Sequence, residues 1–277
     1  MFKRILIPLD GSIYSDAAVR RACEVASAHG AEITGLVILN TPELLNESKL
    51  PFNAQLLDLE QRGYFQRKAQ AEQRICDILK KFSDACEDRG VRHRQAELQG
   101  VPADCILEES VYYDLIVMGI ETYFHLDPDK EGHSMEKVLD RTEVPILAVP
   151  YEDRSVAFKN VLVAFNGSYH SARALREFVE LSEPYHFKIT LLISDKDEEY
   201  ADHCLHEGLE YLRANGVEDV SQVRTGKDII QAIDEDYLNE IDLIVAGIHS
   251  KNVFRNFFVG SFVKHLIEVQ KTPLFLG

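Results

Sequence analysis

Short apolar runs alternate with longer amphipathic stretches along the chain, and each kind of segment predicts one kind of element. Lys3 to Leu9 is a short apolar run, typical of a buried strand, and it ends at the turn Asp10-Gly11-Ser12. An amphipathic stretch follows, from an expected N-cap at Ser15 to an expected end at Gly30. Strands that alternate with helices predict a parallel sheet with helices on both faces and any ligand crevice at the carboxyl ends of the strands.

The same alternation continues to the end of the chain. Further strands are expected at Ile33–Leu39, Arg92–Leu98, Ile146–Val149, Asn160–Phe165, Ile189–Ile193, Leu243–Ala246 and Leu274–Leu276. Long polar helices are expected up to about Arg89 and from Glu198 to Asn215. The predicted fold class is therefore α/β.

One stretch of the sequence occurs twice. The tail, Asp242 to Gly277, has the pattern of a strand, a loop, a helix and a strand, and Asp114 to Pro150 aligns with it without a gap at an offset of 128 residues. The turn Asn166-Gly167-Ser168 likewise repeats Asp10-Gly11-Ser12 at an offset of 156 residues. The two offsets differ by 28 residues, about the length of a segment from Thr41 to Gln70 that has no counterpart in the second half. An internal repeat of this size predicts tandem domains.

We place the predicted domains at residues 1–150 and 151–277, with an insertion at about 41–70 in the first. The expected fifth strands, Ile146–Val149 and Leu274–Leu276, have exposed edges unless they are paired. Pairing these two edges would join the halves of the chain as a pseudo-dimer.

The loop before the last helix has a specific glycine spacing. Gly247 is followed after two residues by Ser250, and nine further residues lead to Gly260 and Ser261. This spacing closely resembles the nucleotide loop of universal stress proteins, G-x2-G-x9-G-(S/T), with Ser250 in place of the middle glycine. The resemblance covers nearly the whole chain, as two tandem domains of this family. It implies Rossmann-like domains of the adenine nucleotide alpha hydrolase-like type, each a five-stranded parallel sheet with helices on both faces.

The resemblance also implies where a nucleotide binds. In this family an acidic residue after the first strand lies near the nucleotide, the second strand contacts adenine through its backbone, and the glycine loop wraps the ribose and phosphates. The matching residues of the second half are Asn166, Ile193, Gly247, Ser250, Gly260, Ser261 and Phe262. Those of the first half, which we predict to be a degenerate site, are Asp10, Val37, Gly119, Thr122, Gly132 and His133.

The two halves depart from the family pattern in different ways. The second half keeps Gly260-Ser261, and a Gly-Ser at a helix start offers free N–H groups to a phosphate, but Asn166 replaces the carboxylate. The first half keeps Asp10 but has Thr122 at the middle glycine and His133 at the end of the loop. Threonine is a poor occupant of the middle position if that position needs a positive φ. We therefore expect the nucleotide in the second half.

The function implied by the resemblance is that of a stress-response protein in which ATP or AMP, with or without Mg²⁺, acts as a regulatory ligand. An alternative is a nucleotide-independent interaction protein whose degenerate pockets serve as scaffold, and a third candidate is a slow Mg²⁺-dependent ATPase. No sequence pattern nominates a catalytic nucleophile or base, so no catalytic residue is assigned. Family members associate through the fifth strand, which implies a homodimer or the intramolecular pseudo-dimer.

Two clusters of potential metal ligands have simpler explanations. One loop contains His125, Asp127, Asp129, Glu131 and His133, and a predicted helix contains His203, Cys204 and His206. Alternating acidic residues in a loop are typically solvated, and the helical cluster lacks a third ligand from elsewhere. No structural metal is expected.

Charge and composition narrow the range of partners and compartments. The formal net charge of -16 argues against a nucleic acid or an anionic membrane surface as partner. No segment approaches the ~20 consecutive apolar residues of a membrane span. The five cysteines include no C-x-x-C pair, and their odd number gives no disulfide framework. We therefore expect a soluble, cytoplasmic protein.

Overall fold

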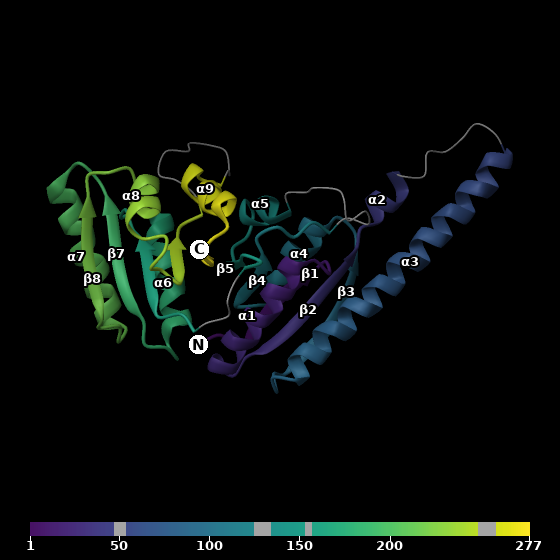
Figure 1. Cartoon of the computed structure of the whole chain (residues 1–277), viewed down its shortest axis with the longest axis horizontal. Coiled ribbons are helices and arrows are strands. Elements are labelled where there is room, and N and C mark those ends of the chain that lie inside the picture. Colours follow the sequence, from purple (N-terminus) through teal and green to yellow (C-terminus); the bar gives the residue numbers. More distant parts are fainter. Residues whose placement is uncertain (47–53, 125–133, 153–156, 249–258) are drawn as a thin grey trace.

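The strands of the protein form a single 10-stranded sheet within the residues that the structure describes. The computed structural model describes residues 1–46, 54–124, 134–152, 157–248 and 259–277 (Figure 1). The strand order is β3-β2-β1-β4-β5-β10-β9-β6-β7-β8, so each half of the chain contributes five neighbouring strands. Within each half, all neighbouring strands run parallel.

The elements of the two halves follow each other in the same order. The first half contains β1 (Arg4–Leu9), α1 (Ile13–His29), β2 (Glu32–Leu39), α2 (Thr41–Asn46), α3 (Ala54–Glu87), β3 (His93–Gln99), α4 (Pro102–Ser110), β4 (Leu115–Gly119), α5 (Ser134–Leu139) and β5 (Ile146–Val149). The second half contains β6 (Asn160–Ala164), α6 (Tyr169–Ser182), β7 (Lys188–Ser194), α7 (Glu198–Ala214), β8 (Val220–Thr225), α8 (Ile229–Asp236), β9 (Leu243–Ala246), α9 (Ser261–Val269) and β10 (Leu274–Leu276). The predicted strands are present, with ends shifted by one residue at most.

The sheet is buried on both faces by helices. Because side chains alternate along a strand, Ile5 and Ile7 of β1 pack with α1 and α3, whereas Leu6 packs with Ile106 of α4 on the other face. Burying one such side chain completely contributes roughly 1.5–3 kcal/mol. This arrangement confirms the predicted α/β class with parallel sheets and helices on both faces.

The halves of the sheet are joined through their fifth strands. β10 pairs antiparallel with β5, and Phe275 lies opposite Leu147 at the centre of this short ladder. Both residues are fully buried. Of the two arrangements predicted from the sequence, the intramolecular pseudo-dimer is therefore formed within one chain.

In each half, an aspartate at the equivalent position accepts backbone hydrogen bonds from the start of the first strand. Asp114 Oδ2 accepts hydrogen bonds from the backbone N–H groups of Lys3 (2.7 Å) and Arg4 (2.9 Å). Asp242 Oδ2 accepts from the N–H groups of Lys159 (3.0 Å) and Asn160 (2.9 Å). The repeat seen in the sequence is thus a repeat of contacts, because the same residue fixes the same strand end in both halves.

The start of α1 differs from the prediction. Its N-cap is Ser12 and not Ser15: the Ser12 side chain accepts a hydrogen bond from the Ser15 N–H (3.2 Å), so Ser15 already lies in the first turn. Ser168 caps α6 in the same way through the Ser171 N–H (3.2 Å). The predicted end of α1 at Gly30 is confirmed, and Gly30 adopts the left-handed conformation typical of a helix end.

The predicted insertion lengthens the helix that follows the second strand. Residues 41–70 contain α2 and the first part of α3, which has 34 residues against 17 in its counterpart α7. Figure 1 shows the first turns of α3 projecting beyond the sheet. No helix in the described part of the chain is both long and apolar enough to cross a membrane.

Candidate functional site

A cavity of about 260 Å³ lies at the carboxyl ends of β6, β7 and β9. Asn166 follows β6, Ser194 ends β7 and Gly247 follows β9, while Asp228 and Gly260 bring the starts of α8 and α9 to the same space. This is the edge at which parallel α/β sheets bind ligands. The volume lies close to the lower end of the ~300–1,000 Å³ range of small-molecule sites.

The cavity gathers part of the predicted second-half site. Four predicted residues line it: Asn166, Gly247, Gly260 and Phe262. Ile193 is fully buried in the core and does not line it; because side chains alternate along β7, the neighbouring Ser194 faces the cavity instead. The Ser261 side chain is exposed and also lies outside the lining. Ser250 lies outside the described residues.

Asn166 is held in a fixed orientation by its own turn. Its Oδ1 accepts hydrogen bonds from the Ser168 N–H (3.1 Å) and the Ser171 hydroxyl (2.9 Å). Its carbonyl oxygen accepts from the Tyr200 hydroxyl (3.1 Å). Among the described residues, the Nδ2 amino group of Asn166 has no acceptor, so the side chain presents two N–H donors at the cavity wall.

The start of α9 offers a second set of donors. Gly260 is the N-cap residue, with φ −63° and ψ 150°, and no side chain caps the helix. The first three N–H groups, those of Ser261, Phe262 and Val263, have no carbonyl partner inside a helix. Together with the positive end of the helix dipole they form a potential anion site at the cavity.

Gly247 and Gly119 are required for packing of the first helix of each half. A Cβ on Gly247 would lie 2.7 Å from the carbonyl carbon of His170 in α6, and a Cβ on Gly119 would lie 2.6 Å from Cβ of Tyr14 in α1. These are equivalent positions, and each glycine lets a helix backbone pass close to the end of a strand. The space beside each of these glycines is therefore taken by a helix backbone.

In the first half, a small cavity of about 40 Å³ lies between the carboxyl ends of β1 and β2, helix α3 and Phe124. Asp10 and Val37 line it, but both Asp10 carboxylate oxygens accept hydrogen bonds from the chain: Oδ1 from the Ser12 N–H (2.9 Å) and Oδ2 from the Tyr123 N–H (2.8 Å). Arg74 of α3 also donates to the Asp10 carbonyl oxygen (3.0 Å). The carboxylate that the family resemblance assigns to a nucleotide is thus satisfied by protein groups.

Residues 122–124 follow β4, and Phe124 lines this small cavity. Thr122 is buried, and its hydroxyl donates to the Gly119 carbonyl oxygen (2.8 Å). Phe124 is buried with φ 47°, and its carbonyl oxygen accepts from Asn40 Nδ2 (3.3 Å). Phe124, and not Thr122, has the left-handed backbone conformation. The positive φ that would have made threonine a poor occupant is therefore not needed at position 122. Gly132 and His133 lie outside the described residues.

Glu121, which precedes this segment, connects it to the second half of the chain. Glu121 Oε2 accepts from the Tyr123 hydroxyl (2.7 Å), and its Oε1 accepts from Gln270, the residue that ends α9. The Tyr14 hydroxyl donates to Gln270 Oε1 (3.1 Å). Burial alone would raise the pKa of Glu121, but the hydrogen bonds from Tyr123 and Gln270 and the proximity of the Tyr14 hydroxyl outweigh it and lower this pKa. One ionised carboxylate therefore ties α9 to the first half.

Three further residues of the cavity were not identified from the sequence. Ser171 orients Asn166, Ser194 ends the second strand of its half, and Asp228 caps α8 through the Ile230 N–H (2.9 Å). The N-cap pattern before α8 is a sequence signal that could have identified Asp228. Ser194 can be identified only once it is known which side chains of β7 face the cavity.

The described residues contain no group of three or more His, Cys, Asp and Glu side chains arranged to hold a metal ion. Cys204 of the helical cluster is buried against the core, and the loop cluster at 125–133 lies outside the described residues.

The chain shares its fold and part of its sequence with known proteins. The universal stress protein family model matches residues 1–150, more than half of the sequence, and the chain belongs to this family. Universal stress protein MJ0531 of Methanocaldococcus jannaschii is 29% identical over 154 residues, which make up 54% of this chain and 82% of that protein.

Two solved structures are similar over almost the entire chain. A universal stress protein from Archaeoglobus fulgidus DSM 4304 matches with a TM-score of 0.73 and 21% identity, over 99% of this chain and 97% of its own. PA1789, a functionally unknown protein from Pseudomonas aeruginosa PAO1, matches with a TM-score of 0.60 and 13% identity, over 99% and 92% of the two chains. At these identities the likeness concerns the fold.

Proposed function

We propose that this universal stress protein is a cytoplasmic stress-response module that binds one adenine nucleotide, ATP or AMP, in the second-half cavity. The observation that carries the proposal is the open space beside Asn166 at the uncapped start of α9. In the first half, both carboxylate oxygens of Asp10 already accept hydrogen bonds from the chain, and Phe124 is buried beside Asp10. The residues after β1 and β6 therefore differ in the free donors or acceptors that they offer a nucleotide.

The donors at the cavity support a position for each part of the nucleotide. We assign a phosphate to the N–H groups of Ser261, Phe262 and Val263, where the helix dipole stabilises negative charge without a lysine. The free N–H₂ donors of Asn166 suit the ribose oxygens, and the base is placed at the end of β7 near Ser194. Binding through backbone donors is compatible with the strongly acidic composition of the chain.

Asn166 also defines the expected role of magnesium. A neutral amide is a weaker ligand for Mg²⁺ than the carboxylate that the first half has at the same position. We therefore expect AMP, which has one phosphate, to bind equally well with and without Mg²⁺. No residue of the cavity is assigned a catalytic role, and the nucleotide acts as a ligand that stabilises one conformation.

A regulatory effect needs a connection between the cavity and the remainder of the chain. Helix α9 provides one, because it begins at the cavity with Gly260 and ends at Gln270, which contacts Tyr14 and Glu121 of the first half. Its nine residues span about 13 Å. A nucleotide regulates the protein only if it binds two positions of α9 with different affinity. We propose the contacts of Gln270 as the element that changes.

The test is nucleotide binding by a matched pair of glycine variants, measured by calorimetry with ATP, ADP and AMP. Gly260→Val keeps an allowed backbone conformation and puts an isopropyl group into the cavity. Gly226→Val makes the same change at a residue outside the lining where a Cβ meets open space. We expect Gly260→Val to weaken binding by tenfold or more, roughly 1.4 kcal/mol, and Gly226→Val to leave it unchanged.

Circular dichroism and thermal unfolding control for folding of both variants. Equal affinity of the wild-type protein and a folded Gly260→Val variant would exclude the second-half cavity. If the wild-type protein binds none of the three nucleotides with a Kd below about 1 mM (roughly 4 kcal/mol), the nucleotide function is wrong, and the interaction-protein alternative replaces it.

A further inference from the structure

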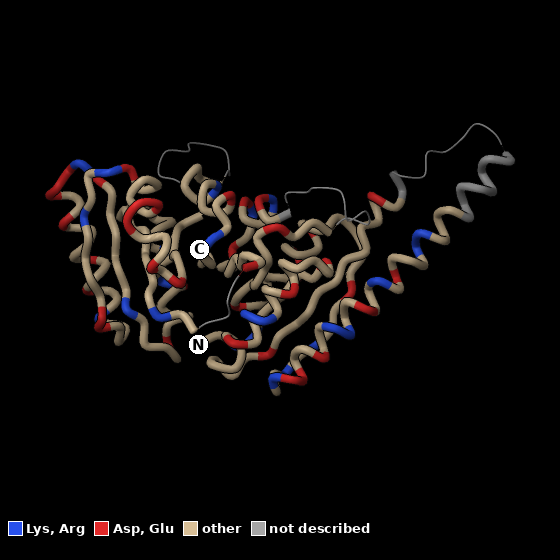
Figure 2. Tube along the Cα trace, viewed as in Figure 1, with Lys and Arg blue, Asp and Glu red and all other residues tan. Residues whose placement is uncertain are grey.

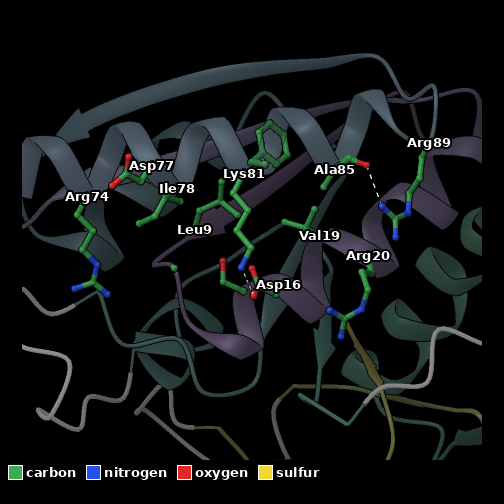
Figure 3. A pocket seen from close by; sticks show the side chains of 13 residues that line it. Leu9, Asp16, Val19, Arg20, Arg74, Asp77, Ile78, Lys81, Ala85 and Arg89 are labelled. Carbon is green, nitrogen blue, oxygen red and sulfur yellow. Dashed lines mark hydrogen bonds and ion pairs between the residues drawn. The ribbon is translucent and has the colours of Figure 1, made fainter.

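A second, larger cavity lies between α1 and α3, on the face of the first half that these helices cover (Figure 3). Its volume is about 420 Å³, within the range of small-molecule sites. The apolar part of its wall comes from both helices and from the end of β1: Leu9, Val19, Ile78, Phe82 and Ala85. It is separate from the second-half cavity, with which it shares no residue.

Four basic side chains surround the apolar wall. Lys81 forms an ion pair with Asp16 across the cavity (2.5 Å), so its charge is compensated. Arg74 donates a hydrogen bond to the Asp10 carbonyl oxygen (3.0 Å), and Arg89 donates to the Ala85 carbonyl oxygen (3.1 Å). A carbonyl oxygen is neutral, so the positive charges of both guanidinium groups are not compensated by these contacts.

Arg20 completes the basic group from the α1 side of the cavity. Across the described part of the chain, no carboxylate pairs with Arg20, Arg74 or Arg89. Three unpaired guanidinium groups around one cavity are unexpected in a chain with a net charge of -16. They indicate that the cavity attracts an anion.

The second half shows that the fold does not require the three basic residues of α3, Arg74, Lys81 and Arg89. Gly11 lies against Arg74 and Ile78 of α3, and its repeat equivalent Gly167 lies against Tyr200 and Cys204 of α7. These equivalent contacts align α3 with α7 at an offset of 126 residues. At this offset, the counterparts of Lys81, Ala85 and Arg89 are Glu207, Tyr211 and Asn215.

The two helices consequently differ in charge. Figure 2 shows Lys and Arg spread along α3 among Asp and Glu. The sequence of α3 contains six residues of each sign, whereas α7 contains five acidic residues and one arginine. The basic cavity is therefore a feature of the first half only.

We propose that the α1–α3 cavity binds an aliphatic monocarboxylate, with the carboxylate at Arg20 and Arg89 and the hydrocarbon chain along Val19, Phe82 and Ile78. Figure 3 shows Arg20 and Arg89 at the same end of the cavity and Arg74 at the other. A guanidinium matches a carboxylate through two parallel hydrogen bonds. A small inorganic anion would make no contact with the apolar wall. The carboxylates of Asp16 and Asp77 in the lining would repel a polyanion such as a nucleotide triphosphate.

The experiment uses the full chain and calorimetric titration with decanoate below its micelle-forming concentration. Decan-1-ol has the same chain length without the charge, and acetate has the charge without the chain. We expect decanoate to bind, and decan-1-ol and acetate to bind at least tenfold more weakly. Equal binding of decan-1-ol, or no binding of decanoate with a Kd below about 1 mM, would overturn the proposal.

Four variants test where the ligand binds. Arg20→Gln and Arg89→Gln are each expected to weaken decanoate binding about tenfold, because each removes a charge-assisted hydrogen bond. The matched control is Arg176→Gln, the repeat equivalent of Arg20 in the second half, whose exposed side chain is far from the cavity lining; it should bind decanoate as the wild type does. Ala85→Tyr introduces the residue found at the equivalent position 211 and should abolish binding by filling the cavity.

Thermal unfolding establishes that each variant is folded, and nucleotide titration of the same samples should give the wild-type result. Loss of decanoate binding in Arg176→Gln to the same extent as in Arg20→Gln would contradict the assigned site. Full retention of binding in both Arg20→Gln and Arg89→Gln would contradict it equally.

Discussion

Gly35 of β2 lies directly beneath Phe82 of α3, and a Cβ on Gly35 would fall 2.7 Å from Phe82 Cε1. The second half has the reverse arrangement at the equivalent positions. There the strand carries the large residue, Leu191, and the helix carries the small one, Gly208, whose Cβ would lie 2.9 Å from Leu191 Cδ2. Each half thus keeps one large and one small residue at this helix–sheet contact, because interiors are packed to nearly constant density.

This exchange predicts strong coupling between the two positions of the first half. Gly35→Leu alone should destabilise the fold by about 1–3 kcal/mol through overpacking, and Phe82→Ala alone by about 3–5 kcal/mol through a cavity. The double variant should be less destabilised than the sum of both changes by about 1–3 kcal/mol, because the leucine fills the space of the lost ring. Urea unfolding of all four proteins measures this cycle. Additive effects, within about 0.5 kcal/mol, would show that the two residues do not share one packing site.

His29 predicts a specific loss of stability in mild acid. It is buried between the halves, where Nδ1 accepts from the Phe2 N–H (3.2 Å) and Nε2 lies 3.1 Å from the Leu181 carbonyl oxygen. Burial, which disfavours the imidazolium form, lowers the pKa of His29 from 6.5 to about 4. The unfolded chain therefore binds more protons than the folded protein between these values, and stability falls as the pH drops through this window.

The expected loss due to His29 is about 3 kcal/mol, most of it between pH 6.5 and pH 4. Urea unfolding across this range should show a steeper decline for the wild type than for His29→Gln. The matched control is His186→Gln at an exposed histidine, which should follow the wild type. Parallel decline of the wild type and His29→Gln would show that His29 is not the group responsible.

Equivalent substitutions after β1 and β6 should separate a structural residue from a binding residue. Asn166→Ala removes the free N–H₂ donors at the second cavity and should weaken nucleotide binding roughly three- to tenfold. Asp10→Ala should leave the nucleotide affinity unchanged but lower the free energy of unfolding by about 1–3 kcal/mol, because the Ser12 and Tyr123 N–H groups lose their acceptor. Calorimetry and urea unfolding of both variants test this. A weaker nucleotide affinity in Asp10→Ala would place the ligand in the first half.

The elements that repeat along the sequence were predictable because they depend on local pattern. Leu243–Ala246 and Leu274–Leu276 are bounded in the structure as predicted, because Asp242 and Gly247 flank the first strand and Pro273 and Gly277 flank the second. The equivalent roles of Asp114 and Asp242 follow from the same repeat. The helix start at Ser12 was missed because two serines three residues apart both fit an N-cap, and only the direction of one hydrogen bond distinguishes them.

The contents of the two crevices could not be predicted, because they depend on contacts between segments far apart in the sequence. Phe124 is held beside Asp10 by a hydrogen bond with Asn40, 84 residues earlier, and has a backbone conformation that is uncommon for phenylalanine. The tight approach of Tyr14 to Gly119 likewise joins a helix and a strand that the sequence separates. The family motifs therefore indicated the position of the second-half cavity, but not the contacts that satisfy Asp10 in the first half.

The most direct test of the proposed function is the map of amide chemical-shift changes when the ¹⁵N-labelled protein is titrated with ATP or AMP. We predict that the largest changes occur at Ser261, Phe262 and Val263 and at Asn166, with only small changes at Asp10 and Tyr123. The same pattern should be absent in Gly260→Val. Changes centred on Asp10 and Tyr123, or no changes at saturating nucleotide, would contradict the account.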